Sequence, residues 1–418
     1  MAVVKPFHAY SPKQEFVLDV HCLPYDVLSY EDARQYGENN PKSFVHVTRS
    51  EIDLNLDKES DVYSEKVYHK AKENLNRLIT ENIYVRETEP CFFVYEQKTE
   101  KLSQCGLVCL ISVDDYQNNV IKVHERTRNV KETDRINHID ILQADAEPVF
   151  CFFNPVDDVL TEIFFEIKKS APDYHFTTKE GIENSLWKVN QHLDIDNITC
   201  YFASIPAIYI ADGHHRAKAA FEVREKYKKS RSNWDKAEKS NFFLSVLFPA
   251  KQLNILAYNR VIKNVENIGI DEFKNILADD FIIKKIDKTE LPDRNKIPQG
   301  KGEIGFYMEK NWYLLKLKNT DLAESHLDVE ILQNRILEPY FKILNPRTDK
   351  NIAFIGGIYG ENRLEELVDS GEWDLAFSMF PVRVDDIVNV AGQNKIMPPK
   401  STWFEPKLTS GLFFYKFD

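Results

Sequence analysis

The sequence predicts an α+β or mixed α/β fold, and three observations support this class. The chain has 418 residues, 43% of them hydrophobic, which allows two or three domains with sizeable cores. Short β-rich apolar runs and amphipathic helical runs are intermixed along it. They follow no steady strand–helix–strand period, which argues against a regular barrel. We expect an N-terminal α/β region over residues 1–265 and a C-terminal α/β region over residues 266–418.

The N-terminal segment predicts a strand, a helix, a second strand and a longer helix. The first helix begins near Ser29, a good N-cap, and Glu31 and Asp32 suit its first turn. Residues 44–47 are predicted as the second strand. The run "DVYSEKVYHKAKENLNRLITEN" is predicted as the longer helix, because apolar residues recur at helical spacing at Val67, Ala71, Leu75 and Leu78.

The middle of the chain predicts an antiparallel meander and then alternating helices and strands. The β-rich runs of the meander are "CFFVYEQ", "LVCLISVDD" and "VIKVHERT". Helices are predicted in "RNVKETDRINHIDILQADA" and "VDDVLTEIFFEIKKS", with the buried strand "PVFCFFN" between them. The run "SLWKVN" is predicted to begin another helix, and "ITCYFASIPAIYIAD" to supply strands.

The last part of the chain predicts further intermixed elements. "RAKAAFEVREKYKK" and "IDEFKNILADDF" read as helices, and "NFFLSVLFPAKQLNILAYNRVIK" between them as two strands. A hairpin is predicted in "EIGFYMEKNWYLLKLK", and helical patterning over residues 327–337. Residues 351–382 are predicted to be rich in loops.

Charge and composition narrow the class of partner. The net charge of −12 argues against duplex nucleic acid and suits small polar ligands better. No apolar run approaches the roughly 20 residues of a membrane span, and no signal-peptide core is evident. We therefore expect a cytoplasmic protein that binds neither nucleic acid nor membrane. The six scattered cysteines are expected to be buried thiols.

The stretch "YIADGHHRAKAA" predicts a strand, a sharp turn at Asp212-Gly213 and a helix that begins near the histidines. The free backbone N–H groups and the positive end of the helix dipole then lie beside Arg216, as in phosphate-binding turns. His214 and Lys218 would share a helical face, while His215 points about 100° away.

Alternative interpretations of this turn remain. A zinc site would be incomplete, because adjacent histidines lack the i, i+4 spacing and have no nearby third ligand. In a purely structural corner, Asp212 would cap the helix. We favour anion binding, with Asp212 available for proton transfer or as a metal ligand.

A second cationic group lies in "HERTRNVKETDRINH". Arg128, Lys131 and Arg135 are spaced to share one helical face that could bind phosphate. The alternative is a solvated helix, in which these cations pair with the acidic residues between them.

Acidic candidates precede this helix. Asp26 in "LPYDVLS" could act as a general base, or could be an ordinary turn residue. Arg49 and Glu51 end a predicted strand, where ligand contacts are frequent. Near the C-terminus, "MPPKSTWFEPK" could hold a phosphate or a carboxylate on a Pro-fixed loop through Lys400, Ser401 and Thr402.

Five of these motifs together resemble one family, formerly a domain of unknown function, which carries the DGHHR box. They are "LPYDVLS", "NNPKSFVHVTRSEIDL", "ERTRNVKETDR", "ADGHHRAKAA" and "MPPKSTWFEPK", and they span nearly the whole chain. Members resemble free L-serine kinases with a ParB/sulfiredoxin-like core, and one branch uses pyrophosphate.

The resemblance implies phosphoryl transfer from pyrophosphate, or from ATP or ADP, to the hydroxyl of free L-serine, which gives O-phospho-L-serine. It also implies Mg²⁺, with Asp212 as its expected ligand. Donor phosphates and proton transfer are assigned to Asp212, Gly213, His214, His215 and Arg216. Arg126, Arg128 and Lys131 are expected to contact the donor or the serine carboxylate. Either Asp26 or Glu51 would be the base.

Other classes of protein are open as alternatives. ParB-type DNA-binding clamps share the core, but the acidic charge argues against one. A sulfiredoxin-type reductase needs a cysteine in the turn, where this chain has Gly213 and His214. A non-catalytic protein that binds a nucleotide or a phosphometabolite is the third. The oligomeric state is not predicted.

Overall fold

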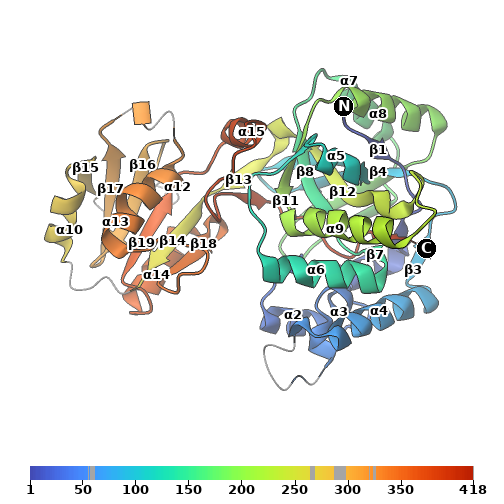
Figure 1. Cartoon of the computed structure of the whole chain (residues 1–418), viewed down its shortest axis with the longest axis horizontal. Coiled ribbons are helices and arrows are strands. Elements are labelled where there is room, and N and C mark those ends of the chain that lie inside the picture. The colour runs from blue at the N-terminus through green and yellow to red at the C-terminus, as the bar shows by residue number, and fades with distance from the viewer. Residues whose placement is uncertain are drawn as a thin grey trace. The chain divides into compact units, whose positions relative to one another are not determined.

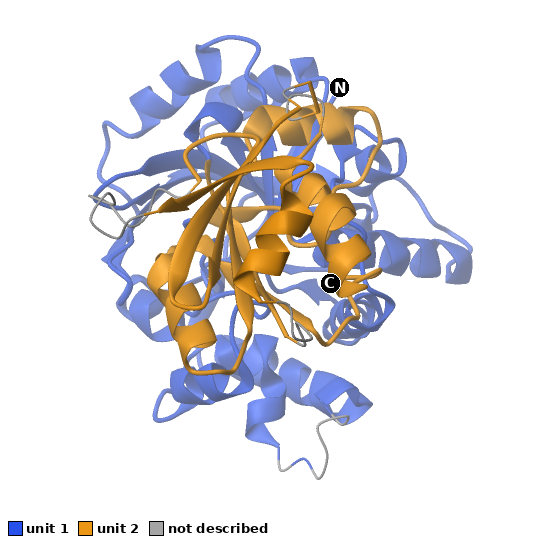
Figure 2. Cartoon of the chain, turned by 90° about the vertical axis from the view of Figure 1, so that its left-hand side faces the viewer, with its two compact units in different colours: residues 1–253, 406–418 blue, residues 254–405 orange. Residues whose placement is uncertain are grey.

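The computed structural model describes residues 1–54, 56, 62–263, 269–286, 298–319, 321–322 and 326–417. They form two compact units, of which unit 1 comprises residues 1–253 and 406–418 and unit 2 residues 254–405 (Figure 2). Each unit combines a sheet with helices, so the predicted mixed α/β class is confirmed. The predicted boundary at residue 265 lies outside the described residues.

Unit 1 is built on a mixed sheet of nine strands, counted over the described residues. The strands are β1 (Val4–Lys5), β4 (Phe92–Lys98), β5 (Ser103–Ser112), β6 (Ile121–Lys122), β8 (Val149–Phe153), β9 (Tyr174–Thr177), β10 (Glu183–Val189), β11 (Ile208–Asp212) and β12 (Phe242–Pro249). Their order is β6-β11-β8-β12-β5-β4-β10-β9, with β1 also paired to β5. The β6–β11 and β8–β12 pairs are parallel and the others antiparallel.

Helices cover both faces of this sheet, with α6 and α9 on one side and α7 and α8 on the other (Figure 1). The helices of unit 1 are α1 (Val17–Val20), α2 (Tyr30–Gly37), α3 (Val45–Thr48), α4 (Glu65–Thr80), α5 (Val113–Gln117), α6 (Asn129–Leu142), α7 (Val159–Ile167), α8 (His192–Ser204) and α9 (His214–Ser230). Two short strand pairs complete the unit, β2 (Tyr10–Pro12) with β3 (Tyr84–Arg86) and β7 (Ala144–Asp145) with β21 (Tyr415–Lys416).

The core follows from the apolar pattern of the central strands. Every residue of β8, "VFCFF", is buried, as expected for a strand with neighbours on both edges and helices over the sheet. Phe164 of α7 and Phe202 of α8 pack into the same hydrophobic cluster as β8. On the other side, Ile139 of α6 packs against Val223 of α9, which fixes the two helices that carry most of the predicted cations.

Among its described residues, unit 2 contains a six-stranded antiparallel sheet in the order β15-β17-β16-β19-β14-β18. Its strands are β13 (Asn254–Leu256), β14 (Tyr258–Ile262), β15 (Phe281–Ile286), β16 (Glu303–Met308), β17 (Asn311–Leu317), β18 (Ile352–Gly356), β19 (Leu375–Met379) and β20 (Trp403–Glu405), where β13 pairs with β20. Its helices are α10 (Ile270–Leu277), α12 (Asp328–Leu332) with a π-helical turn over Gln333–Leu337, α13 (Glu338–Phe341), α14 (Gly360–Asp369) and α15 (Val384–Gly392).

Several predicted elements are confirmed. Ser29 caps α2 in a capping box, because its hydroxyl accepts from the Asp32 N–H at 3.1 Å and its N–H donates to the Asp32 carboxylate at 3.1 Å. The predicted apolar face of α4 is buried. The hairpin β16–β17 is also confirmed.

Other predicted elements are wrong. Phe44 is the N-cap of α3 and residues 45–47 lie within this helix, because Val45 and Val47 are fully buried and tertiary packing outweighs their β-propensity. "SLWKVN" lies in β10, which pairs with β4, and "ITCYFAS" lies in α8. The strand predicted in "VIKVHERT" shrinks to β6, which pairs with β11 and does not continue a meander. Residues 351–382 contain β18, α14 and β19 instead of loops.

Within the described ranges, the structure has no helix with the length and apolar character needed to cross a bilayer.

Candidate functional site

The predicted strand–turn–helix at the DGHHR box is present. β11 ends at Asp212 and α9 begins at His214. The pairing of β11 with β8 shifts register between Ile210 and Asp212, so a bulge directly precedes the turn. Bulges of this kind re-aim side chains and are frequent next to active sites. Gly213 follows with φ +95°, a left-handed conformation that favours glycine.

Arg216 folds back over this turn. A Cβ atom placed on Gly213 would lie 3.0 Å from Arg216 Nε, so glycine also makes room for the guanidinium. The side chain is buried, and its Nη1 donates to the Pro148 carbonyl. Burial alone would lower the pKa of Arg216, but the neighbouring carboxylates, Asp26 foremost, outweigh it and raise the pKa. The turn therefore holds a permanent positive charge inside the protein.

Asp212 binds the C-terminal segment of unit 1. Its Oδ1 accepts the Gly213 N–H at 2.8 Å, and its Oδ2 forms a 2.8 Å ion pair with Lys407. Lys407 is the last residue of "MPPKSTWFEPK", and the sequence did not single it out. One carboxylate thus joins the box to the final residues of the chain.

The two histidines occupy different environments. His214 is buried, and neither of its ring nitrogens hydrogen bonds to another described residue. Its ring meets that of His124 edge to face, with centroids 4.6 Å apart, and burial lowers the pKa of His214 to about 4. His215 is half-buried; burial and the charge of Lys131 lower its pKa to about 4, while the carboxylates of Glu125 and Asp26 oppose the shift. Both imidazoles are therefore neutral at neutral pH.

A cavity of 690 Å³ gathers several of the predicted site residues. Its polar lining includes Asp26, Arg49, Glu51, Lys131 and Arg135. The remaining lining is mostly aromatic or apolar, with Tyr25, Leu28, Tyr30, Leu56, Val62, Tyr63, Val67 and Tyr68, together with Thr48, Ser50, Asp134 and His138. It is roomy enough for a small polar substrate beside a larger organic group.

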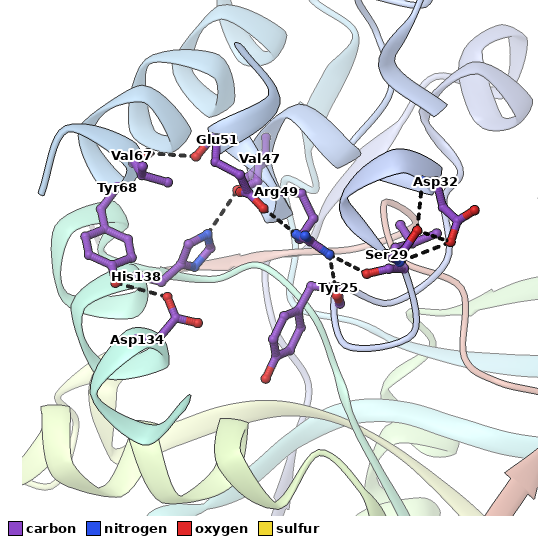
Figure 3. Close-up of polar contacts among 12 residues, drawn as sticks. Tyr25, Ser29, Asp32, Val47, Arg49, Glu51, Val67, Tyr68, Asp134 and His138 are labelled. Carbon is purple, nitrogen blue, oxygen red and sulfur yellow. Dashed lines mark hydrogen bonds and ion pairs between the residues drawn. The ribbon is translucent and has the colours of Figure 1, made fainter. Parts of the chain in front are cut away.

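Arg49 fixes one wall of this cavity (Figure 3). Its Nε lies 2.5 Å from Glu51 Oε1, and its Nη1 donates to the carbonyls of Tyr25 and Leu28. The loop that carries Asp26 is thereby held against the 3₁₀ turn Ser50–Asp53. The Glu51 carboxylate is buried and balanced by this guanidinium.

Helix α6 forms the opposite wall. Arg135 pairs with Asp134 at 2.8 Å and stacks over the ring of Tyr25 at 4.0 Å, and Asp134 also accepts the Tyr68 hydroxyl at 3.0 Å. Burial alone would lower the pKa of Arg135, but these acidic neighbours raise it. Of the three cations predicted to share a helical face, Lys131 and Arg135 lie on α6, half-buried and buried, whereas Arg128 is its exposed N-cap with an extended backbone.

A separate cavity of about 20 Å³ shares the lining residues Arg135 and His138 with the larger cavity. Arg216 lines the smaller one together with Glu147. The Glu147 carboxylate accepts the Tyr25 N–H at 3.1 Å and the Ser410 hydroxyl at 2.6 Å. Two buried guanidinium groups thus lie around one buried carboxylate, and a continuous set of contacts runs from α9 to the loop of Asp26.

Not every predicted residue joins this arrangement. Lys218 lies one turn along α9 and pairs with Glu222 at 2.5 Å, and Arg126 is exposed. The predicted loop of Lys400, Ser401 and Thr402 belongs to unit 2. There the Lys400 carbonyl accepts from Arg260 and the Ser401 hydroxyl donates to the Pro398 carbonyl.

The sequence missed four residues of the arrangement. His124 is the first residue of "HERTRNVKETDRINH" and Lys407 the last of "MPPKSTWFEPK", so their positions beside motif residues were a usable signal. Tyr25 precedes the candidate base directly. For Glu147, in "ADAEPVF", no local pattern distinguishes a buried carboxylate that receives long-range hydrogen bonds.

Metal ligation has limited support from the protein side chains. In the part of the chain that is described, no three His, Cys, Asp or Glu side chains are placed to hold an ion together. Asp212 offers a carboxylate, but both of its oxygens already take donors. Mg²⁺ commonly uses only one or two protein carboxylates and takes its other ligands from phosphates and water. Asp212 supplies one such carboxylate if Lys407 moves away from its Oδ2.

Comparison with known proteins gives a family and distant structural likenesses. Residues 4–334 match the model of DUF1015, described as a protein of unknown function. A free serine kinase in complex with AMP is 12% identical, with 71% of this chain and 86% of that chain covered and a TM-score of 0.38. SbnI with a C-terminal truncation from Staphylococcus aureus is 12% identical, with 72% and 85% covered and a TM-score of 0.36.

A conserved hypothetical protein from Pyrococcus furiosus is 13% identical, with 72% of this chain and 93% of that chain covered and a TM-score of 0.34. No curated protein matches the sequence.

Proposed function

Since the chain belongs to the DUF1015 family, we propose that it is a phosphotransferase that phosphorylates the hydroxyl of free L-serine, with pyrophosphate as donor. The observation that carries the proposal is the gathering of Arg216, Arg135 and Lys131 near the carboxylates of Asp26 and Glu51. The resemblance carried by the five sequence motifs supports serine as acceptor.

Phosphoryl transfer requires positioning and charge neutralisation more than covalent chemistry. In the proposed step, the serine Oγ attacks the terminal phosphorus of the donor, and the bond from that phosphorus to the bridging oxygen breaks. The hydroxyl proton passes to a carboxylate, and inorganic phosphate leaves. Arg216 and Arg135 neutralise charge on the transferring group, with Lys131 at the cavity wall.

Asp26 is our preferred base. Its carboxylate lines the larger cavity and is exposed, and no hydrogen bond or ion pair joins it to another described side chain. Glu51 lines the same cavity but is held by Arg49 at 2.5 Å. A base must be able to receive the proton of the bound hydroxyl. The Glu51 carboxylate, which is already paired with Arg49, is better suited to positioning the loop or the substrate.

The remaining site residues have supporting roles in this proposal. The neutral His215 can donate a hydrogen bond to a donor oxygen, and His214 stays inside against His124 as a positioning residue. Arg126 and Arg128, which are exposed and directly precede α6, clamp the serine carboxylate or the donor. Mg²⁺, held by Asp212, would neutralise phosphate charge when bound.

A nucleotide is the second donor class, and the size of the larger cavity favours it. Pyrophosphate and serine together fill only part of 690 Å³. The rings of Tyr30 and Tyr63 and the side chain of Leu56 are also part of the cavity lining and would suit a nucleoside. The products differ accordingly: phosphate from pyrophosphate, ADP from ATP, or AMP from ADP.

The test incubates the full chain with L-serine, Mg²⁺ and, separately, pyrophosphate, ATP or ADP, and follows phosphoserine by ³¹P NMR. We expect phosphoserine with pyrophosphate. Phosphoserine only with a nucleotide would move the donor assignment to the second class. If no donor yields phosphoserine and the reverse reaction is silent, the kinase assignment fails, and bound phosphoserine without turnover would identify a sensor.

Variants of the two candidate carboxylates test which of them is the base. Asp26→Asn is expected to lower kcat by at least about 10²-fold, in the range of lost general-base catalysis. Glu31→Gln, on the exposed face of α2, is the matched control and should leave kcat unchanged. A larger loss in Glu51→Gln than in Asp26→Asn would transfer the role to Glu51.

A further inference from the structure

Unit 1 contains another cavity, of 130 Å³, that shares no lining residue with the two cavities of the candidate site. Residues of α7 and α8 line it, and these two helices cover one side of the sheet (Figure 1). Phe153 at the end of β8 and Pro249 at the end of β12 reach it, and these strands are parallel. Ligands of α/β sheets commonly bind beyond the carboxyl ends of parallel strands.

The cavity is suited to one small apolar group. Its walls include Phe153, Leu160, Phe164 and Tyr201, each of which is buried. Apolar cavities of about 150 Å³ in other proteins bind benzene, so a volume of 130 Å³ suits a single ring or a branched aliphatic chain. Phe165, also in the lining, is 62% exposed, and a ligand would cover part of this apolar surface.

A positive charge stands at the wall of this apolar cavity. Lys168 lines it, and its Nζ lies 2.8 Å from Glu96 Oε1, while Lys98 lies 2.8 Å from the other oxygen of Glu96. Burial alone would raise the pKa of Glu96, but hydrogen bonds from both lysines lower it. Glu96 thus pairs with both ammonium groups, and Glu183 adds a second carboxylate near Lys98, so Lys168 is the cation that lines the cavity. The contact with Glu96 also fixes Lys168, whose ammonium has three N–H donors.

We propose that this cavity binds a small monocarboxylic acid with one aromatic or branched aliphatic group. The apolar group lies between Phe164 and Tyr201, and the carboxylate accepts hydrogen bonds from Lys168. The volume excludes a nucleotide, and the apolar walls disfavour inorganic phosphate. This site is independent of the proposed kinase function.

The experiment titrates the full chain by calorimetry with 3-phenylpropionate and with its neutral analogue, 3-phenylpropanamide. Both fill the same volume, and only the first carries a charge. We expect the carboxylate to bind at least about tenfold more tightly, which corresponds to about 1.4 kcal/mol and is reasonable for a charge-assisted hydrogen bond. Equal affinities, or no binding of the carboxylate, would overturn the proposal.

Matched variants locate the binding. Lys168→Met should weaken the carboxylate about tenfold and leave the amide unchanged. Lys98→Met removes the other partner of Glu96 without touching the cavity, so it should leave both affinities unchanged. Equal losses in the two lysine variants would show a structural effect of Glu96 and refute a direct contact.

A second pair tests the cavity itself. Thr161→Trp places a large ring at an exposed position of the lining and should abolish binding of both probes. Glu162→Trp, at the next exposed position of α7 and outside the lining, should keep binding. Retained binding in Thr161→Trp would exclude this cavity as the site.

Discussion

Replacement of Arg216 by alanine gives the sharpest test of the candidate site. Arg216 is buried over Gly213, and its raised pKa keeps it charged throughout the working range. At an effective dielectric constant of about 20, two unit charges 4 Å apart interact by about 4 kcal/mol. If this guanidinium neutralises the transferring phosphoryl group, its removal should lower kcat/KM by about 10²- to 10³-fold, or about 3–4 kcal/mol.

The same substitution should also weaken the fold. It leaves the Pro148 carbonyl without its donor and removes the positive charge near Glu147 and Asp212. Loss of one partner from a buried charged group costs about 2–4 kcal/mol, which urea unfolding would measure. Activity must therefore be compared at a temperature at which the variant is folded.

Arg224 supplies the matched control, because it is a second buried arginine on the same helix. It pairs with Asp114 at 2.7 Å and with Gln117 at 2.9 Å and lines none of the cavities described above. Arg224→Ala should lose comparable stability and keep kcat/KM within a few-fold. If Arg216→Ala, fully folded, loses less than about tenfold in kcat/KM, the role assigned to the box is refuted.

Three further predictions concern the same turn. Gly213→Ala should lower the free energy of unfolding by about 1–2 kcal/mol, and so should the control Gly181→Ala, because both glycines have a positive φ. Only Gly213→Ala should impair phosphoryl transfer, because Gly181 has open space around it. Equal activities of the two variants would show that the guanidinium of Arg216 tolerates a Cβ atom. Asp212→Asn and Lys407→Met should each destabilise the protein by about 1–3 kcal/mol, and the double variant by less than their sum; strict additivity in urea unfolding would contradict a direct ion pair. The pKa of His214 in the folded protein is about 4, below its ordinary 6.5. The stability that this residue contributes is therefore present above pH 6.5 and is lost as the pH falls towards 4, by about 2 kcal/mol at pH 5. His214→Gln should flatten the dependence of unfolding free energy on pH between pH 6.5 and 4, and an unchanged dependence would contradict a buried neutral ring.

Local sequence patterns were sufficient to predict those helices and strands whose tertiary packing agrees with their local preference. The capping box at Ser29, the apolar face of α4 and the all-apolar β8 were predictable, because capping and periodicity act within a few residues. Tertiary packing overrode the pattern elsewhere. Val45 and Val47 are β-branched, yet their burial in a hydrophobic cluster of unit 1 makes them part of the short helix α3.

The sequence by itself determined the strand–turn–helix at Asp212-Gly213, the motif set that resembles one family, and the polar residues worth testing. Only the tertiary structure decided which of them meet. Asp26, Glu51, Lys131 and Arg135 lie far apart in the chain and share one cavity. Lys407, nearly two hundred residues beyond Asp212, is its ion-pair partner. Contacts of this kind depend on how strands and helices pack, and no spacing along the chain encodes them locally.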